Sequence, residues 1–599
     1  MAQQDKPTTS DLVIERLLAW NIDTCFGLCG DQINGFFESL RKHADRMRFV
    51  HVRHEENAAL AAVGYAKFAG RPAACVATAG PGAIHLLNGV YDARMDGVPL
   101  IAISGMSYHD TIGSHLIQDV ESDKLFANAC LFNERVMGPA HATTVTDLAV
   151  RSALAHRAPS HIALPIDVQS QSEDKASPKN VPGHHSLAAQ PMVSLPPERE
   201  LQRAAEVLAG CERIAICAGA GARGAGDALE HVADLLAAPI IKAGLGKDCV
   251  PDESEYTTGG MGLIGTRASQ EAFENCDGFL IVGSSTPYYE FWPKPGQARG
   301  VQIDLEPSRI GMRYPVEVGL AGDAGLTLAA LAPLLARHED RSFLERAQTA
   351  TRESWELLRS QAQDEVRPMR PQTVTWQLSE LLPDDAIVTG DAGSVTAWSN
   401  RLKLRRGMQY SFSGTLCSMG AAVPYAIGAQ IAYPQRPVVA FTGDGSMSMG
   451  MGELATLAYY NLPITVVVLH NNSLALEIWE QNALLGNPQF ACDLPSIGFA
   501  QVAEGCGVRG FRVEDPAEVA GTLRAALAHD GPALVEAITD PLEAPFGESL
   551  LPAHAKHLVT AFQNGERDRE AMAANLLQPE RLAQSPSLRG VQDQLERFT

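Results

Sequence analysis

Two short polar segments with the residue types of a metal–diphosphate site follow apolar runs in the last third of the chain. Residues 443–446 (GDGS) follow the apolar run 438–442, and residues 470–473 (HNNS) follow the apolar run 464–469. A glycine-rich turn between a buried strand and a helix can bind a diphosphate through its backbone amides. An Asp in that turn can hold a divalent metal that bridges phosphate oxygens.

The spacing of the two segments indicates how a fold would bring them together. Asp444 and Asn471 are separated by about the length of one helix and one parallel strand. Both side chains would then lie at the carboxyl ends of neighbouring strands, where α/β sheets bind ligands. Each segment alone is common in turns and loops, and their combination at this spacing favours a functional site.

The elements that position these residues follow an alternating pattern. Short β-branched runs alternate with helix patterns along the chain, which is typical of α/β folds with parallel sheets. We expect helices at Glu56–Phe68 and Gly452–Tyr460. We expect strands at Ala73–Ala77, Leu100–Ser104, His161–Pro165, Arg213–Ala218, Phe279–Val282, Gly300–Asp304, Ala386–Thr389, Val438–Thr442, Ile464–Leu469 and Ala533–Ala537.

Two segments of different composition divide the chain. Residues 170–197 are polar and rich in proline, which predicts a linker, and residues 337–370 are dense in charge, which predicts a connecting helix. We therefore expect three α/β domains, each a doubly wound parallel sheet, at residues 1–170, 197–336 and 371–545. Residues 546–599 are predicted to form a helical C-terminal extension, and residues 566–599 show no clear apolar face.

Composition excludes several classes of protein. The chain has 599 residues, a formal net charge of −22 and 45% hydrophobic residues, which argues against a nucleic-acid-binding protein and against disorder. The 11 cysteines have no zinc-site spacing, which favours a reducing compartment. The first residues lack the apolar run of a signal peptide, and the uncharged segment 416–434 contains Pro424 and Gln430, which favours a buried helix. We expect a cytoplasmic protein.

The GDGS and HNNS segments at this spacing resemble the cofactor motif of thiamine diphosphate-dependent enzymes. The resemblance implies a Mg²⁺ ion bound by Asp444, the Asn471 side chain and the Ser473 carbonyl. It also implies that the diphosphate contacts Gly443, Gly445 and Ser446. Oxygen ligands of this kind suit a small, hard cation.

An N-terminal segment supports the same resemblance. In these enzymes the first Glu of a His-Glu-Glu segment hydrogen-bonds the aminopyrimidine ring of the cofactor, and residues 54–56 here are His-Glu-Glu. A carboxyl group in an apolar pocket can exchange a proton with a ring nitrogen, which is how the family activates its cofactor. Glu55 is therefore the candidate catalytic residue, and we assign no role to Glu56.

Further positions match the family around the cofactor rings. Met419 occupies the position of the apolar wedge that folds the cofactor, and Ser418 precedes it. Residues 79–82 (AGPG) match the turn over the pyrimidine, which adds Gly82 and His85 to the predicted contacts. Taken alone, a methionine is more often core and a histidine more often a satisfied buried group.

The middle of the chain closely resembles the FAD domain of pyruvate oxidases and quinone-dependent pyruvate dehydrogenases. The matching segments include 261–265, 282–288, 301–304 and 308–315, and no acidic residue is placed for a nicotinamide site. An empty dinucleotide fold, or one that holds ADP, stays open. The resemblance implies FAD contacts at Gly219, Gly221, Gly262, Leu263, Ile264, Ser284, Ser285, Thr286, Pro287, Tyr288, Asp304 and Asp323.

Two positions depart from the pyruvate oxidase pattern. The family usually has Phe-Gln at the substrate pocket, where this chain has Ile117 and Gln118, and an aromatic residue near the flavin, where this chain has Leu476. Both changes reshape the pocket. Gln118 and Glu480 are the candidate polar contacts to a 2-oxo acid.

The resemblance implies oxidative decarboxylation of a 2-oxo acid, with pyruvate as the expected substrate. The reaction would pass through a cofactor ylid and an enamine that is oxidised by flavin, and a quinone or oxygen would reoxidise the flavin. Two alternatives remain: a non-oxidative carboligase of the acetolactate synthase type, with FAD structural or absent, and a catalytically silent cofactor-binding protein.

The resemblance also implies an oligomer. In the family the site lies between two chains, with the His-Glu-Glu segment from one and the metal motif from the other, so a homodimer or homotetramer is expected. Membrane docking through the C-terminal extension is not expected, because residues 566–599 lack a clear apolar face. No nucleic-acid partner is expected.

Overall fold

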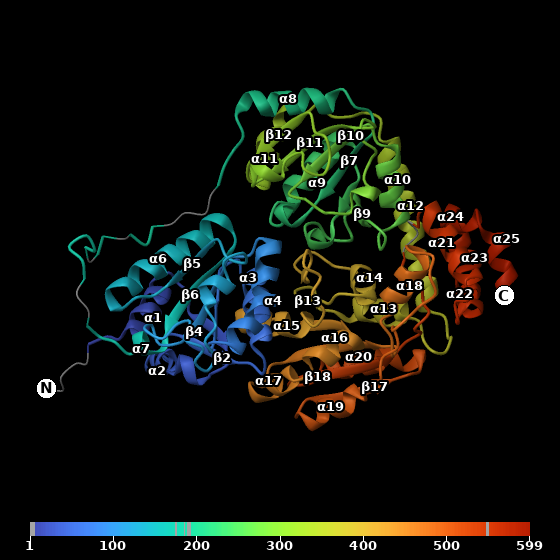
Figure 1. Cartoon of the computed structure of the whole chain (residues 1–599). Coiled ribbons are helices and arrows are strands. Elements are labelled where there is room, and N and C mark those ends of the chain that lie inside the picture. Colours follow the sequence, from blue (N-terminus) through green and yellow to red (C-terminus); the bar gives the residue numbers. More distant parts are fainter. Residues whose placement is uncertain (1–5, 174–175, 182, 185, 189–192, 547–549) are drawn as a thin grey trace.

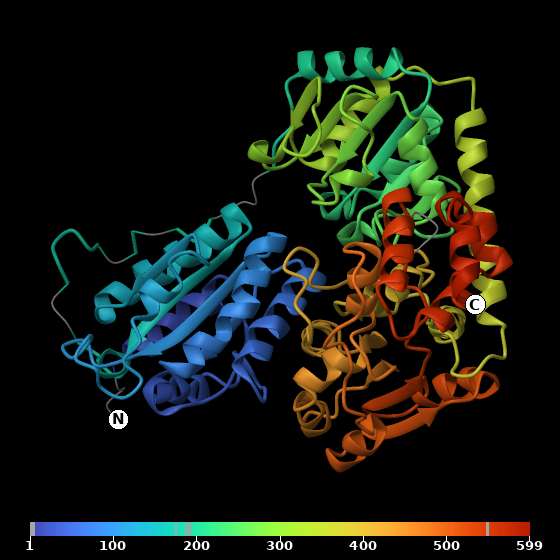
Figure 2. The same ribbon diagram turned by 45° about the vertical axis from the view of Figure 1, so that its right-hand side comes forward.

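Three parallel sheets of six strands, each flanked by helices, form the body of the molecule (Figures 1 and 2). The structure is a computed structural model and describes residues 6–173, 176–181, 183–184, 186–188, 193–546 and 550–599. Parts of the predicted linker and of the predicted extension therefore lie outside the described residues. The expected α/β class with three parallel-sheet domains is confirmed.

The first sheet has the order β2-β1-β3-β4-β6-β5. Its strands are β1 (Thr24–Gly27), β2 (Arg48–His51), β3 (Ala74–Ala77), β4 (Leu100–Met106), β5 (Phe132–Arg135) and β6 (Pro159–Pro165). Its longer helices are α1 (Thr9–Ala19), α2 (Asn34–Lys42), α3 (Glu55–Ala69), α4 (Pro81–Asp96) and α6 (Pro139–His156).

The central sheet has the order β12-β11-β10-β7-β8-β9. This is the order of the classic dinucleotide-binding sheet, with the reversal between β7 and β10. Its strands are β7 (Ile214–Ala218), β8 (Ile240–Lys242), β9 (Thr257–Gly260), β10 (Gly278–Val282), β11 (Arg299–Asp304) and β12 (Val318–Ala321). Its longer helices are α8 (Glu198–Ala209), α9 (Gly226–Leu236), α10 (Arg267–Asn275) and α11 (Ala324–Leu331).

The third sheet, β14-β13-β15-β16-β18-β17, repeats the relative strand order of the first. Its strands are β13 (Ile387–Gly390), β14 (Gln409–Ser411), β15 (Val438–Gly443), β16 (Ile464–His470), β17 (Arg509–Val513) and β18 (Ala533–Ile538). Its helices are α13 (Pro371–Leu381), α14 (Ser394–Asn400), α15 (Ala422–Ala432), α16 (Asp444–Gly450), α17 (Glu453–Tyr459), α18 (Ala475–Ala483), α19 (Phe499–Gly505) and α20 (Val519–Leu527).

All ten predicted strands are present, with ends within two residues of those expected. The strands that the sequence did not predict include both edges of each sheet, such as β5 (FNER) and β17 (RGFRV). Edge strands bury less of each side chain, so their runs are shorter and more polar than those of central strands. Both predicted helices are present, as α3 and α17.

Helices α3 and α15 cross closely and join the first domain to the third. A Cβ on Gly64 would lie 2.5 Å from the Cα of Tyr425, and one on Gly428 would lie 2.1 Å from the carbonyl oxygen of Ala61. Only glycine allows this approach. The uncharged segment 416–434 thus contains a buried helix, as expected, and among the described residues no helix combines the length and apolar character needed to cross a bilayer.

Helix α12 (Ser342–Ala362) connects the central and third domains, and the C-terminal helices lie beside it (Figure 2). These helices are α21 (Pro552–Gln563), α22 (Arg569–Leu576), α23 (Pro579–Gln584), α24 (Pro586–Arg589) and α25 (Gln592–Leu595). The expectation that residues 566–599 lack an apolar face was wrong: Met572, Leu576, Leu588 and Leu595 are buried in a cluster that includes Trp479 of α18. Each short helix contributes one or two apolar residues, so no single helix shows the face.

Candidate active site

The turn after β15 places Asp444 at the carboxyl edge of the third sheet, beside the loop that follows β16. The backbone amides of Asn471 and Asn472 donate to Oδ2 of Asp444 at 3.0 and 2.6 Å, and the amide of Gly445 donates to Oδ1 at 2.9 Å. Burial raises the pKa of the Asp444 carboxyl, although these amide donors lower it in part. The two predicted halves of the motif are therefore in direct contact.

The Asn471–Ser473 loop is folded on itself. The backbone amide and the hydroxyl of Ser473 both donate to Oδ1 of Asn471 at 3.0 Å. Asn472 adopts a φ of 57°, a left-handed conformation that asparagine accepts more readily than most residues. Together, Asp444, Asn471 and Ser473 offer carboxylate, amide and carbonyl oxygens at one edge of the sheet.

A buried aspartate that the sequence analysis missed supports this turn. Asp391 follows β13 and is 1% exposed. It accepts hydrogen bonds from the backbone amide of Gly420 at 2.8 Å and from the hydroxyl of Thr442 at 2.9 Å. Because β13 and β15 flank the reversal of strand order, Asp391 ties the Met419 loop to the start of the GDGS turn. A polar Asp two residues after the predicted strand Ala386–Thr389 was the sequence feature that could have indicated this position.

Met419 lies directly over the GDGS turn. A Cβ on Gly445 would lie 3.2 Å from Cε of Met419 and 3.1 Å from Cδ2 of Leu474, so this position fits only a glycine without displacement of its neighbours. At Gly443 the nearest such atom is 3.9 Å away, and the Ser446 hydroxyl contacts the carbonyl of Ala392 at 3.5 Å. Apolar side chains of Met419 and Leu474 thus pack against the backbone of the glycine turn.

Glu55 begins α3 and faces the turn that opens α4. Its side chain is buried, and Oε2 lies 3.0 Å from Nδ1 of His85. A Cβ on Gly82 would lie 3.3 Å from Oε1 of Glu55, and the rings of His54 and His85 stack with centroids 4.5 Å apart. The three residues that the sequence placed near a pyrimidine ring (Glu55, Gly82 and His85) are therefore together.

Contacts between domains hold this first-domain cluster against the third domain. The backbone amide of Arg53 and the side-chain amide of Asn57 donate to Oε1 of Glu453, at the start of α17, at 2.9 and 3.0 Å. The side-chain amide of Asn88 donates to the hydroxyl of Ser418 at 2.7 Å. Glu55 and Met419 therefore belong to segments that are bonded across the same domain junction.

The two candidate substrate contacts lie in different domains. Gln118 has a φ of 57°, its Cβ would be 2.8 Å from a Cβ on Gly80, and its Oε1 is buried with no partner among the described residues. Glu480 lies on α18, where burial and the neighbouring Glu477 raise its pKa. Burial, and then the charges of Cys417 and Glu480, raise the pKa of Tyr288 in the central domain.

The central sheet brings its glycine-rich turns together at the reversal of strand order. A Cβ on Gly219 would lie 2.4 Å from the carbonyl oxygen of Gly283, and one on Gly221 would lie 2.7 Å from Cα of Gly283. These turns follow β7 and β10, with Ser284 buried beside them. Asp304 ends β11, is buried, and has a pKa raised by that burial.

The other predicted FAD contacts are more dispersed. Gly262 has a φ of 83°, and Leu263 packs on the cluster formed by α18 and the C-terminal helices. Asp323 caps α11, since its side chain accepts a hydrogen bond from the backbone amide of Leu326 at 3.0 Å. This capping role explains why an aspartate stands here, whether or not FAD binds. The remaining positions form the loop after β10 and the end of the 262–264 turn: Ile264, Ser285, Thr286, Pro287 and Tyr288.

Comparison with known families covers all three domains. Residues 7–125 match the N-terminal TPP binding domain of thiamine pyrophosphate enzymes, residues 201–331 match their central domain, and residues 391–537 match their C-terminal TPP binding domain. The chain belongs to the thiamine pyrophosphate enzyme family.

Relatives of this thiamine pyrophosphate enzyme differ in activity. The chain is 34% identical to the thiamine pyrophosphate-containing protein YdaP of Bacillus subtilis, over 88% of this chain and 91% of that one. It is 29% identical to a pyruvate oxidase of Lactiplantibacillus plantarum, over 95% and 94%. It is 28% identical to acetolactate synthase 3 of Brassica napus, over 91% and 84%. The family thus includes decarboxylases and carboligases that act on 2-oxo acids.

The residues present fit thiamine diphosphate. The glycine turn at Gly445 lies beneath Met419 at the start of α16, and the start of a helix after a glycine turn is where backbone amides can bind a diphosphate. The buried carboxyl of Glu55 and the unpartnered Oε1 of Gln118 offer polar contacts beside the glycine turn of α4. This thiamine pyrophosphate enzyme therefore retains the polar and apolar groups that its cofactor needs in both domains.

Proposed function

We propose that this enzyme oxidatively decarboxylates a 2-oxo acid, with pyruvate as the expected substrate, using thiamine diphosphate, Mg²⁺ and FAD. The observation that carries the oxidative assignment is the central sheet. Its strand order is that of dinucleotide-binding proteins, and its glycine turns meet at the reversal of that order.

Each candidate residue would have a separate role in binding the cofactors or in moving a proton. Asp444, Asn471 and Ser473 would hold Mg²⁺, for which their oxygen atoms are suitable ligands. Glu55 would hold and exchange a proton at its carboxyl oxygen, and Met419 would contact the cofactor through its apolar side chain. When bound, thiamine diphosphate supplies a carbon nucleophile and an electron sink, and FAD accepts two electrons.

Glu480 and Gln118 would bind the substrate. Because burial raises the pKa of Glu480, this carboxyl keeps its proton to a higher pH than an exposed glutamate and could donate it to an oxygen of the 2-oxo acid. The unpartnered Oε1 of Gln118 could accept a hydrogen bond in the same pocket. A quinone or oxygen is proposed as the electron acceptor.

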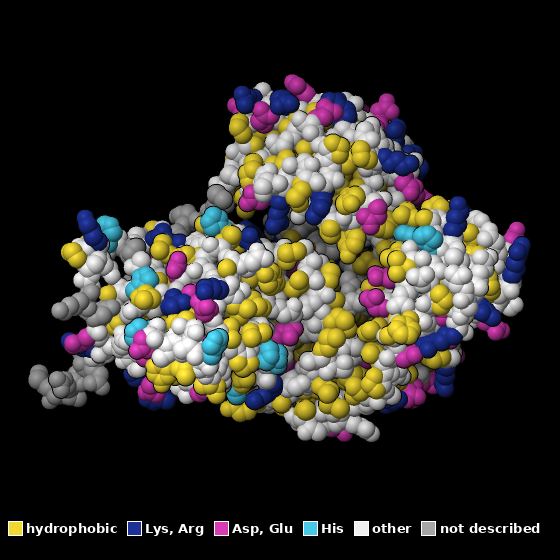
Figure 3. Space-filling view, in the orientation of Figure 1, with side chains coloured by type: hydrophobic (Ala, Val, Ile, Leu, Met, Phe, Trp, Pro, Cys, Tyr) yellow, Lys and Arg dark blue, Asp and Glu magenta, His cyan; other side chains and the backbone are white. Residues whose placement is uncertain are grey.

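We propose that a second copy of the chain completes the site in a homodimer or homotetramer. Large apolar side chains stay exposed in the loops and helices around both half-sites, and Figure 3 shows hydrophobic side chains gathered over the first and third domains. They include Ile84, Leu116, Ile117, Met449, Met451, Tyr459 and Phe490. Burial of such a surface between copies is the usual reason for so many exposed apolar residues.

A non-oxidative carboligase is the second candidate function. It is favoured by Ile117 and Leu476, which stand where pyruvate oxidases usually have aromatic side chains. Loss of the planar group between the two predicted cofactors would weaken the case for electron transfer to flavin.

An anaerobic visible spectrum separates the two candidates. The protein purified with thiamine diphosphate and Mg²⁺ is recorded before and after addition of pyruvate. Bleaching of a flavin band supports oxidative chemistry on pyruvate. A flavin band that persists with pyruvate and with other 2-oxo acids contradicts the proposal and favours the carboligase, as does the absence of a flavin band.

A further inference from the structure

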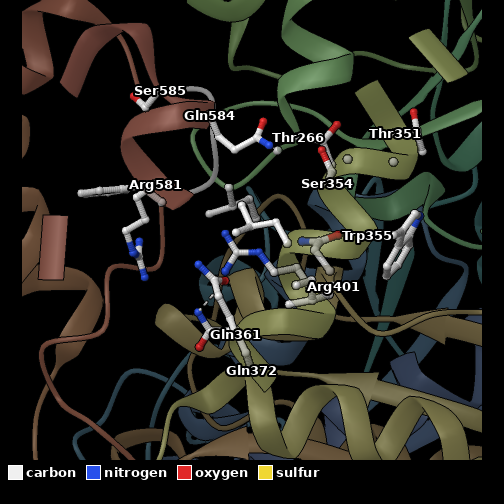
Figure 4. Close-up of a pocket in the computed structure, with 18 of the residues that line it drawn as sticks. Thr266, Thr351, Ser354, Trp355, Gln361, Gln372, Arg401, Arg581, Gln584 and Ser585 are labelled. Atoms are coloured by element: carbon white, nitrogen blue, oxygen red, sulfur yellow. Dashed lines mark hydrogen bonds between the residues drawn. The ribbon is translucent and has the colours of Figure 1, made fainter. Parts of the chain in front are cut away.

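A cavity that shares one lining residue, Ile264, with the predicted FAD contacts lies where four segments of the chain meet. It has a volume of about 100 Å³ and is partly open to solvent. Figure 4 shows Thr266 of the central domain above it, Ser354 and Trp355 of α12 on one side, Arg581 and Ser585 of the C-terminal helices on the other, and Gln372 below. The central domain, the connecting helix, the third domain and the extension therefore all contribute a wall.

Two buried polar atoms in these walls have no hydrogen-bond partner among the described residues. Gln372 is 2% exposed and its Oε1 has no hydrogen-bond partner among the described residues. The Nε of Arg581 is likewise buried without a partner in the described part of the chain. One atom is an acceptor and the other a donor, and an unpaired buried polar atom costs free energy until a ligand or water satisfies it.

Glu543 fixes the orientation of both groups. The side-chain amide of Gln372 and the guanidinium of Arg581 both donate to Oε1 of Glu543. Burial alone would raise the pKa of Glu543, but Arg581 and Gln372 bring it below its ordinary value, so the carboxylate is an acceptor only. A flip of the Gln372 amide would turn its oxygen toward this carboxylate. The Oε1 atom of Gln372 therefore points away from Glu543 and cannot be satisfied by it.

The remaining lining favours an uncharged occupant with an apolar body. Ile264, Trp355, Leu358, Phe546 and Leu588 supply apolar surface. Two of the charged lining residues are paired: Arg581 with Glu543, and Asp252 with Lys242 and Lys247. Arg401 donates to the carbonyl of Pro545 at 3.2 Å. A carboxylate would face the Gln372 oxygen, which repels it, whereas a carboxamide has a donor and an acceptor side by side.

We propose that this cavity is a binding site for a small, uncharged carboxamide with a short apolar body, which donates to Gln372 and accepts from Arg581. The volume is smaller than a cavity of roughly 150 Å³ that accepts benzene, so the apolar body is a short aliphatic group. Ile264, which lines this cavity, also belongs to the predicted flavin path, so FAD has to be tested as a competitor.

Calorimetric titration of the full-length protein with isobutyramide and with isobutyrate tests the site. The two probes share one shape, and only the amide has the donor. We expect saturable binding of isobutyramide and binding of isobutyrate at least tenfold weaker, with saturating thiamine diphosphate, Mg²⁺ and FAD present. Equal binding of both probes, or no binding because the cavity holds water only, overturns the proposal. Loss of amide binding on addition of FAD also overturns it, because the cavity would then be part of the flavin site.

Matched variants locate the binding. Ser354→Phe fills the cavity from α12 and should weaken isobutyramide binding at least tenfold, whereas Ser360→Phe, at an exposed position of the same helix that does not line the cavity, should leave it unchanged. Gln372→Met keeps the volume, removes the acceptor and should give a similar loss. If Gln372→Met does not fold because Glu543 loses a donor, the comparison of Ser354→Phe with Ser360→Phe still tests the site. Unchanged binding in Ser354→Phe contradicts the site.

Discussion

Nδ1 of His85 lies 3.0 Å from Oε2 of Glu55, at the junction of α3 and α4. The contact joins the first residue of α3 to the fifth residue of α4, and the two helices follow the edge strand β2 and the inner strand β3 of the first sheet. A carboxyl that is buried and bonded on one oxygen has a fixed direction. Glu55 is thereby held in one orientation, which suits the proton exchange proposed for it.

Replacement of Glu55 by Gln should abolish most turnover while cofactor binding persists. The amide preserves size and hydrogen bonding but cannot exchange the proton, so we expect kcat to fall by about 10²–10⁴-fold. Steady-state kinetics and a titration with thiamine diphosphate measure the two effects separately. Glu56→Gln is the matched control, since Glu56 contacts Asn88 instead of His85. Retained activity in Glu55→Gln would show that another group performs the proton transfer.

Removal of the metal should inactivate the enzyme reversibly. Asp444 and Asn471 supply the proposed oxygen ligands, so dialysis against a chelator should abolish activity and Mg²⁺ should restore it. Asp444→Asn should raise the Mg²⁺ concentration needed for half-activation by about tenfold or more, by loss of the charge on the ligand. Asp530→Asn, at an exposed position, serves as the control. Full activity after chelation would contradict the metal site.

Gly428→Ala should destabilise the protein at the crossing of α3 and α15. The added Cβ would lie 2.1 Å from the carbonyl oxygen of Ala61, and backbone cannot move aside at low cost. We expect the free energy of unfolding to fall by about 2 kcal/mol or more. Gly521→Ala, on the exposed surface of α20 with open space around it, should instead stabilise by about 0.5–1 kcal/mol. Equal effects of the two substitutions in urea unfolding would show that the crossing does not depend on glycine.

Lys247 should make the free energy of unfolding depend on pH between about 8 and 10.5. Burial, opposed in part by Asp252, lowers its pKa from 10.5 to about 8. Between these values the folded chain binds fewer protons than the unfolded chain, so the contribution of Lys247 to stability is lowest below pH 8 and rises toward pH 10.5. Lys247→Met removes this charge from the interior.

The test is the difference in unfolding free energy between Lys247→Met and the unchanged protein. This difference should shift against the variant by about 1–3 kcal/mol as the pH rises through that range. Lys179→Met, at an exposed lysine, corrects for the loss of one positive charge. A difference that stays constant with pH would mean that Lys247 titrates normally in the folded protein.

The sequence by itself determined the elements and motifs that depend on neighbours along the chain. Asp444 and Asn471 were found because a buried central strand has a continuous apolar run, and the polar residue after it must lie at the sheet edge. The ten predicted strands share this property. The glycine turns at Gly219 and Gly445 were recognised for the same reason.

The tertiary structure decided the features that depend on residues far apart in the chain. Asp391 supports the Met419 loop only because β13 and β15 are neighbours, and the edge strands exist only because a central strand is there to pair with them. The apolar face of the C-terminal helices is assembled from single residues on several helices. The cavity between Gln372 and Arg581 arises where four segments pack around Glu543, and no local pattern encodes the fit between such distant side chains.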